Sequence, residues 1–407
     1  MSFVRSLACR ACGTAVEKIA IVACPSCGGQ LDPVYDWQAV QEAVARDDLA
    51  ARPRSIWRYR ELLPLDEPPG VSKHVGWTPL VDAPALADLL GVKRLWVKFD
   101  GASFPSLSFK DRVVAVAINK ARELGIETVG CPSTGNLANA VAAHAAAAGL
   151  DAWIFVPESI EPAKILGTAV YRPNMVRVRG TYDQINRLCR DAATRFGWGI
   201  VNVNLRAYYG EGSKTMAFEI AEQLGWRPPT AVVAPMAGGS LVTKLARGFA
   251  ELGRLGWLEG DPPRIHGAQP AGCNPIVAAV HDGTDTIAAV APDTRVKSLA
   301  IGDPVDGPWA ARAIRATGGW AAAVSDDDMV DGIRLLAEAT GIFTETAGGV
   351  TVAAARQLAQ DARLGADDRV VLCLTGNGMK TVDVLAEALE PPPTIAPTLA
   401  DLESLLG

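Results

Sequence analysis

Between Leu95 and Thr375, short β-rich apolar runs alternate with longer Ala- and Leu-rich segments of helical period. This alternation predicts βαβ units and parallel sheets, because a helix has to cross the sheet before the next parallel strand can pair. A helix is also expected after Ser325, where three aspartates form a capping-box-like start. The other expected helices cover 111–124 and 137–148, and the expected strands cover 95–98, 128–131, 153–156, 231–234, 265–268 and 369–374. The predicted fold class is therefore α/β.

The composition fits a large folded chain. Its 407 residues are 49% hydrophobic and 21% charged, which supplies apolar surface for a sizeable core and excludes a mostly disordered protein. Acidic residues outnumber basic ones by 45 to 39, for a formal net charge of −6. A surface of this sign repels phosphate backbones and anionic lipid, so neither nucleic acid nor membrane is an expected partner. We find no signal peptide or membrane-spanning run in the sequence and expect a cytoplasmic protein.

Two C-x-x-C pairs, Cys9 with Cys12 and Cys24 with Cys27, lie within the first thirty residues. Two such tight turns facing each other can place four thiolates around one ion, and four sulfur ligands close the tetrahedral shell that zinc adopts in structural sites. We expect structural zinc here; a pair of knuckles without metal, or a redox dithiol, is the alternative. The other four cysteines are scattered, which argues against a disulfide framework.

The segment from Asp47 to His74 is charged and contains four prolines. Because prolines and charges interrupt regular apolar patterns, this segment is expected to be a linker and not a core element. The prolines at 391–393 are expected to end the last domain.

Four polar or glycine-rich clusters each follow a predicted strand. They are Ser108–Arg112, Ser133–Asn136, Ala237–Leu241 and Thr375–Gly378. In open α/β sheets the ligand binds beyond the carboxyl ends of the strands, so the four clusters could line one site. Signatures of P-loop, Rossmann and nucleophile-elbow proteins do not occur in the sequence.

Lys110 lies at the start of a predicted helix, where the helix dipole disfavours a cation by a few tenths to about 1 kcal/mol. The same field, with Phe109 alongside, would favour the neutral amine that attacks an aldehyde, as a Schiff-base lysine must do. A solvated lysine with its charge offset by Asp111 is the alternative.

The other clusters offer complementary binding groups. Consecutive N–H groups at the Gly238-Gly239-Ser240 turn can bind the phosphate of a cofactor, although a tight βα turn would need the same glycines. The Ser133–Asn136 cluster could hold a carboxylate, with simple N-capping as the alternative. Thr375 ends an apolar strand, so its hydroxyl would point into the crevice unless it is only a core-edge threonine.

Taken together, these clusters resemble the threonine synthase family of fold-type II pyridoxal-phosphate (PLP) enzymes. The resemblance covers nearly the whole chain, and the order of its motifs makes it specific. Besides the cysteine pairs and the phosphate turn, the matching motifs are G-W-T-P-L (76–80), S-F-K-D-R (108–112), S-T-G-N (133–136), E-G-S-K-T (211–215), I-G-D-P (301–304), G-I-F-T-E-T (341–346) and T-G-N-G-M-K (375–380).

The resemblance implies a tryptophan-synthase-β-like architecture, with two parallel-sheet α/β domains and a small N-terminal zinc ribbon. The implied divisions are a zinc ribbon at 1–36, a large PLP-binding domain at 37–104 and 206–390, a small mobile domain at 105–205 and a C-terminal tail at 391–407. Motion of the small domain would close the cleft and exclude water.

The resemblance also implies roles around the cofactor. Lys110 would bind PLP as a Schiff base and then shuttle protons at the substrate's α and β carbons, with Phe109 beside it. Asn136 would hydrogen-bond the cofactor's 3′-oxygen, and Thr375 would face its pyridine nitrogen. The cofactor phosphate would be bound by main-chain N–H groups of Ala237, Gly238, Gly239, Ser240 and Leu241.

For the substrate, the resemblance implies that Ser133 and Thr134 hold the α-carboxylate. Arg206, with Asn204 nearby, is the candidate for the substrate phosphate, since a guanidinium fork matches phosphate oxygens. A surface ion pair is the alternative for Arg206.

In the family reaction, O-phosphohomoserine loses phosphate and takes up water at the β carbon to give threonine. We therefore expect a PLP-dependent carbon–oxygen lyase of amino-acid biosynthesis, and the resemblance allows a homodimer. The family's usual N-P-T-G before S-F-K-D-R is replaced here by Phe104-Pro105-Ser106-Leu107, whose bulk would alter the pocket. Two alternatives stay open: β-replacement on O-phosphoserine, as in the cysteate synthase branch, and an inactive PLP-binding homologue that acts as a sensor or partner.

Overall fold

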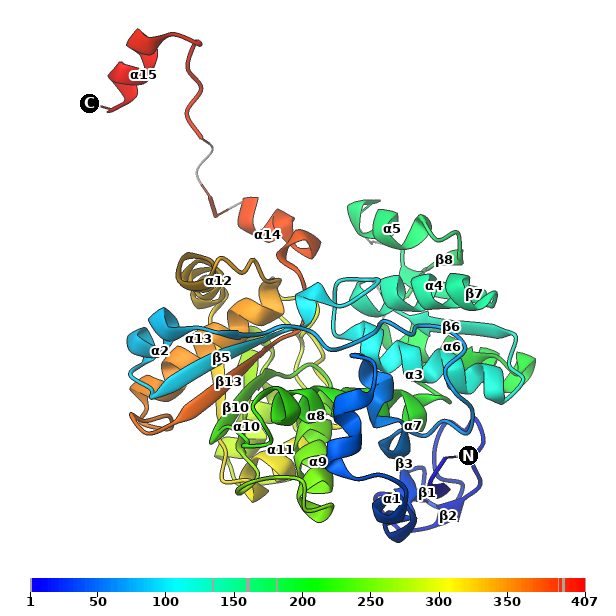
Figure 1. Cartoon of the computed structure of the whole chain (residues 1–407). Coiled ribbons are helices and arrows are strands. Elements are labelled where there is room, and N and C mark those ends of the chain that lie inside the picture. The colour runs from blue at the N-terminus through cyan, green and yellow to red at the C-terminus, as the bar shows by residue number, and fades with distance from the viewer. Residues whose placement is uncertain are drawn as a thin grey trace.

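The computed structural model describes residues 2–133, 135–158, 162–180, 182–386, 388–389 and 392–406. Within these ranges the strands form three sheets (Figure 1). The N-terminal sheet is antiparallel, with strand order β2-β1-β3. Its strands are β1 (Val4–Cys9), β2 (Ala15–Val16) and β3 (Leu31–Tyr35), and α1 (Trp37–Ala43) follows them.

The largest sheet has strand order β12-β11-β10-β13-β5-β4, and every pair in it is parallel except β4 with β5. Its strands are β4 (Leu80–Asp82), β5 (Arg94–Phe99), β10 (Ala231–Pro235), β11 (Arg264–Pro270), β12 (Ala321–Val324) and β13 (Arg369–Leu374). Every residue of β10 is buried, because helices cover both faces of the sheet.

The two faces of the large sheet have different covering helices. Along β10, Val232 packs into a cluster with α8, α9, α10 and α11, whereas Val233 packs into a cluster with α2, α12 and α13. This alternation is the period of two expected of a strand covered on both sides. These helices are α2 (Pro84–Leu90), α8 (Lys214–Gln223), α9 (Ser240–Arg254), α10 (Pro275–His281), α11 (Gly307–Ala316), α12 (Asp326–Thr340) and α13 (Thr346–Gln360).

The third sheet is parallel, with order β8-β7-β6-β9, and lies beside the large-sheet unit (Figure 1). Helices α3 and α4 pack together on one face, and α6 packs against β6, β7 and β9. The elements of this unit are α3 (Lys110–Glu123), β6 (Thr128–Pro132), α4 (Asn136–Ala148), β7 (Asp151–Pro157), α5 (Pro162–Ala169), β8 (Asn174–Val178), α6 (Tyr182–Phe196) and β9 (Gly199–Ile200).

Short helical segments join the sheets, and the chain after 392 extends away from the body (Figure 1). No helix within the described ranges combines the length and the apolar character needed to span a membrane. The remaining segments are α7 (Arg206–Tyr209), α14 (Val382–Ala386), α15 (Leu399–Leu406) and the 3₁₀ helices η1 (Arg46–Ala51), η2 (Ile56–Leu62), η3 (Asp100–Ala102), η4 (Gly210–Ser213), η5 (Ala271–Cys273) and η6 (Gly378–Lys380).

The predicted strands and helices are confirmed, with bounds that differ by at most two residues from the expected ranges. The helix start at Ser325 is also confirmed, since Ser325 Oγ accepts a hydrogen bond from Asp328 N at 3.0 Å.

The prediction of a linker at 47–74 is wrong. Most of η2 is buried, and Tyr59 donates to Glu222 Oε2 of α8 at 2.5 Å. Ile56 and Trp57 pack with Val116 of α3. The prolines do interrupt regular structure, but the apolar side chains between them cover the α3–α8 region.

Candidate active site

Lys110 is the first residue of α3, and the loop after β13 fixes its position. Phe109 N donates to Thr375 O at 2.8 Å, and a single antiparallel bridge pairs Ser108 with Gly376. The Lys110 Nζ donates to the Tyr209 hydroxyl at 3.2 Å and lies 5.5 Å from the centre of the Phe109 ring. The amine is therefore held at the carboxyl end of the large sheet, between two aromatic rings.

Arg112, two residues after Lys110, anchors the first turn of α3. Arg112 is fully buried and donates to Asp100 Oδ2 at 2.6 Å and to Glu219 Oε1 at 2.5 Å. Lys98 Nζ donates to Glu219 Oε2 at 2.7 Å. Burial alone would raise the pKa of Glu219, but the charges of Arg112 and Lys98 hold it at about 2. A buried network of hydrogen-bonded charged groups therefore supports the start of the lysine-bearing helix.

Glu345 joins the two sheets at the site. Its Oε2 accepts from Asn136 Nδ2 at 2.8 Å and its Oε1 accepts from Thr375 Oγ1 at 3.0 Å. Burial raises the pKa of Glu345, against those two hydrogen bonds and the nearby charges of Lys380 and Lys110. This carboxyl group thus brings together Asn136 at the start of α4 and Thr375 after β13.

Gly376 shows how tightly this corner is built. A Cβ at Gly376 would lie 2.4 Å from the Glu345 carboxyl carbon, so only glycine allows the carboxyl group to approach the main chain here.

The turn after β10 contains two glycines with different roles. The backbone conformation of the turn requires Gly239, whereas Gly238 borders open space. Gly239 has φ +89°, and a Cβ there would lie 2.9 Å from Ala310 Cβ. Gly238 needs no positive φ, and apart from the turn's own adjacent residues no heavy atom of the described chain lies within 4 Å of the position of its Cβ. For residues 237–241, the structure pairs none of the main-chain N–H groups with an acceptor in the described part of the chain.

The turn at α9 therefore offers a row of free donors beneath open space at a helix N-terminus, which suits a phosphate dianion. Together with the amine of Lys110, the amide of Asn136 and the hydroxyl of Thr375, the residues present fit PLP.

The structure describes only some of the predicted substrate residues. Ser133 Oγ accepts from Gly135 N at 3.3 Å, a local turn contact, and Thr134 lies outside the described residues. Arg206 donates to the buried Asp306 Oδ2 at 2.5 Å, so the ion pair held open as an alternative is present, although its partner is buried.

The amide of Asn204 is hydrogen-bonded within its own loop. Its Oδ1 accepts from Ile200 N at 2.8 Å and its Nδ2 donates to Trp198 O at 2.9 Å. Both ends of the amide are occupied by main-chain groups of the same loop, so Asn204 stabilises the loop before Arg206.

Sequence reasoning did not assign Glu345, Tyr209 or Lys380 to the site. Glu345 and Lys380 lie inside two of the matching motifs, which was the available signal. Lys380 Nζ donates to Asn139 Oδ1 of α4 at 3.0 Å, and burial lowers the pKa of its amine. Tyr209 carried no signal, because it meets Lys110 from a segment about a hundred residues away.

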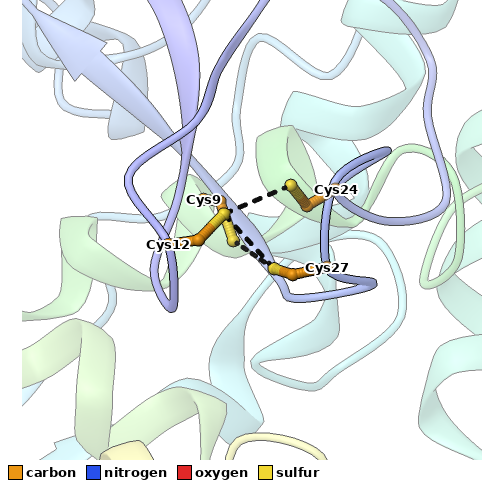
Figure 2. A group of neighbouring side chains, drawn as sticks. All are labelled: Cys9, Cys12, Cys24 and Cys27. Atoms are coloured by element: carbon orange, nitrogen blue, oxygen red, sulfur yellow. Dashed lines mark hydrogen bonds between the residues drawn. The ribbon is translucent and has the colours of Figure 1, made fainter.

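The four N-terminal cysteines form a separate cluster in which the side chains point toward one another (Figure 2). Their sulfur atoms all lie within 4.8 Å of each other, with Cys9 to Cys27 at 3.4 Å and Cys12 to Cys24 at 3.7 Å. All four thiols are free, and four sulfurs about 2.3 Å from a tetrahedral ion would be about 3.8 Å apart. The donor set therefore fits a closed, structural metal site.

Known proteins are similar to this chain over most of its length. The family model described as "Pyridoxal-phosphate dependent enzyme" matches residues 71–376. Threonine synthase from Methanocaldococcus jannaschii is 35% identical, over 94% of this chain and 95% of that protein. Threonine synthase from Methanosarcina acetivorans is 33% identical, over 96% of this chain and 95% of that protein.

Among solved structures, maize serine racemase superposes with a TM-score of 0.63 and 20% identity, covering 78% of this chain and 95% of that one. Threonine deaminase isoform 2 from Solanum lycopersicum superposes with a TM-score of 0.64 and 21% identity, covering 77% of this chain and 87% of that one. These likenesses concern the fold.

Proposed function

The chain belongs to the pyridoxal-phosphate-dependent enzymes and, among them, to the threonine synthase family, and we propose that it converts O-phosphohomoserine and water to threonine and phosphate. It is an enzyme with threonine-synthase-like function and the α/β architecture of fold type II, as its sequence predicted. The observation that carries the proposal is that Asn136 and Thr375 both donate to Glu345 and that Lys110 is close enough for its charge to act on this carboxyl group. The glycine turn after β10 adds open space for a phosphate.

We propose that the chain's own groups hold PLP at both ends. The main-chain N–H groups of 237–241 would bind its phosphate, and the Lys110 amine would hold its aldehyde carbon covalently. Asn136 and Thr375 would face the polar atoms of the ring. When bound, PLP supplies an electron sink that stabilises negative charge on the substrate carbons next to the amine.

Lys110 would then move protons at the substrate's α and β carbons. Its Nζ is already directed by the Tyr209 hydroxyl at 3.2 Å, and Tyr209 is buried. A proton-transfer group acts best when a fixed partner sets its direction, so Tyr209 would position the amine between successive transfers.

For the substrate, we propose that Ser133, Thr134 and the main-chain N–H groups at the start of α4 hold the α-carboxylate. Arg206 would reach the substrate phosphate, because its side chain is 25% exposed and its guanidinium is oriented by Asp306. Phosphate release leaves an anion that a planar guanidinium fork can pair with.

The bulky residues that replace N-P-T-G lie largely in solvent. Phe104 is 63% exposed and Leu107 is 44% exposed. Neither side chain therefore belongs to the buried packing of Phe109 and Ser108 next to the amine.

We propose that Cys9, Cys12, Cys24 and Cys27 bind one structural zinc ion. Four thiolates leave no position for a substrate, so the ion would stabilise the fold around it and would not take part in the reaction.

The test is a phosphate-release assay on the PLP-loaded protein, with O-phosphohomoserine and O-phosphoserine in parallel and chromatographic identification of the product. We expect phosphate and threonine from O-phosphohomoserine, loss of both in K110A, and full activity in K93A, whose lysine is exposed and lies in the loop before β5. Release from O-phosphoserine alone would favour the β-replacement alternative, and PLP binding without turnover of either would favour an inactive homologue.

A further inference from the structure

Arg10 lies between two cysteines of the N-terminal cluster, but its side chain leaves that cluster. Its Nε and Nη2 donate to the two carboxylate oxygens of Asp32, each at 2.8 Å, and its Nη1 donates to Asp306 Oδ1 at 3.0 Å. The Arg10 side chain is only 12% exposed, so its contacts are fixed and shielded from water. The loop around Cys9 and Cys12 is thereby tied to a residue almost three hundred positions away.

Asp306 stands directly against the glycine turn. It precedes α11, and its carboxylate is 2% exposed between Arg10 and Arg206. Its main-chain N–H donates to Gly238 O at 3.1 Å, and its carbonyl oxygen lies 3.0 Å from where a Cβ on Gly239 would be. Any shift of Asp306 therefore displaces the turn that offers free N–H groups.

The N-terminal sheet also reaches the helix that follows the turn. Asp32 of β3 accepts from Lys244 Nζ at 2.7 Å and pairs with Arg247 Nη1 at 3.0 Å, and both residues are on α9. Lys244 is buried and also donates to Glu211 Oε1 at 2.7 Å. The sheet with the four cysteines is thus joined by buried charges to both sides of the glycine turn, at Asp306 and along α9.

We propose that Arg10 is a positioning residue for the phosphate-binding turn, and that the metal-loaded cysteine cluster sets the affinity of that turn through Arg10 and Asp306. A metal ion bound by Cys9 and Cys12 fixes the main chain on both sides of Arg10. The fixed guanidinium holds Asp306, and Asp306 holds Gly238. This inference rests on the proposed assignment of the turn to the phosphate of PLP.

The test compares PLP with pyridoxal, which has the same aldehyde but no phosphate. Equilibrium dissociation constants are measured by absorbance for the full-length metal-loaded wild type, R10Q and R10K. The control is R5Q, because Arg5 is on β1 of the same sheet but its side chain is 67% exposed and pairs with Asp36. Metal content is measured on each sample after thiol modification.

We expect R10Q to retain its metal and to bind PLP about tenfold or more weakly, the scale of one lost charge-assisted hydrogen bond, while its affinity for pyridoxal stays unchanged. R10K keeps the positive charge but loses the forked guanidinium, so its affinity for PLP should lie between those of the wild type and R10Q. The affinity of R5Q should match that of the wild type. Removing the metal from the wild type with a chelator should weaken PLP binding without affecting pyridoxal.

Two results would overturn the inference: R10Q and R10K that bind PLP like the wild type, or variants that lose PLP and pyridoxal to the same extent. If R10Q does not fold, R10K decides by the same comparison. Failure of the proposed function looks different, because it would appear as wild-type protein that binds PLP and releases no phosphate from O-phosphohomoserine.

Discussion

At the scale of single residues, the buried carboxyl group of Glu345 connects the two sides of the candidate site. Glu345 is 2% exposed and accepts hydrogen bonds from one group of each sheet. Because burial raises the pKa of Glu345, the carboxylate form is disfavoured in the folded protein. The unfolded chain gives up this proton more readily, so the ligand-free protein should lose stability as pH rises from about 4.5 through the raised pKa.

The E345Q variant removes this ionisable group with little change in shape. We expect E345Q to gain stability over the wild type as pH rises from 4.5 to 8, by at most about 1.4 kcal/mol for each pH unit and only until the raised pKa is passed. Thermal denaturation of both ligand-free proteins across this range measures the difference. If the difference in stability between the wild type and E345Q does not change with pH, the raised pKa of Glu345 is contradicted.

Tyr209 tests the positioning of the amine. In Y209F the hydrogen bond from Lys110 Nζ is lost, and we expect kcat for phosphate release to fall roughly tenfold while bound PLP is unchanged. The matched control is Y208F, because the Tyr208 hydroxyl bonds to Ile19 O at 3.1 Å, away from the lysine. If kcat falls equally in Y209F and Y208F, or if only KM changes in Y209F, Tyr209 does not act on the amine.

At the scale of elements, the regular βαβ units could be predicted from sequence, because buried parallel strands are continuous apolar runs such as Ala231–Pro235. The segment around Trp57 and Tyr59 could not, because its apolar residues have no helical or strand period and are interrupted by proline and charge. Strand topology places three of the four clusters after strands of the large sheet, whereas Ser133–Asn136 follows β6 of the four-stranded sheet. The bridge at Glu345 could not be predicted, since its partner Asn136 is 209 residues away and only the folded chain brings them together.

The helix that begins with Lys110 depends on the buried charges beneath it. Replacing Glu219 by Gln leaves Arg112 and Lys98 short of a negative partner, and we expect E219Q to lose about 3 kcal/mol of unfolding free energy at pH 7. Urea denaturation measures this loss, with E338Q on the exposed side of α12 as the control.

The same pair of proteins gives a pH signature. The pKa of Glu219 is about 2 in the folded state against 4.5 ordinarily, so its stabilising contribution is complete above about pH 4.5 and is lost as pH falls towards 2. The difference in unfolding free energy between the wild type and E219Q should therefore become smaller as pH falls from 4.5 to 2. A constant difference would mean that Glu219 stabilises by packing and not by charge.

At the scale of the whole molecule, the candidate site is assembled from two sheets. Lys110 and Thr375 lie next to the large sheet, whereas Asn136 begins a helix of the four-stranded sheet, and contacts such as Lys380 with Asn139 connect the two. Ligands that engage both sides draw such units together. We propose that residues 105–205 close over the cleft when substrate binds.

Small-angle X-ray scattering of the PLP-loaded protein, with and without O-phosphohomoserine, measures this closure. We expect the radius of gyration to decrease on addition of the substrate and to stay unchanged on addition of inorganic phosphate, which engages only one side. Identical curves in all three samples would contradict closure.

The central claim is that the Lys110 amine holds the aldehyde carbon of PLP. Borohydride reduction of the PLP-loaded protein, followed by proteolysis and mass spectrometry, tests it directly because reduction makes the bond permanent. The account predicts one modified peptide, carrying the cofactor on Lys110, and no modification in K110A. Modification of a different lysine, or a protein that takes up no PLP, would contradict it.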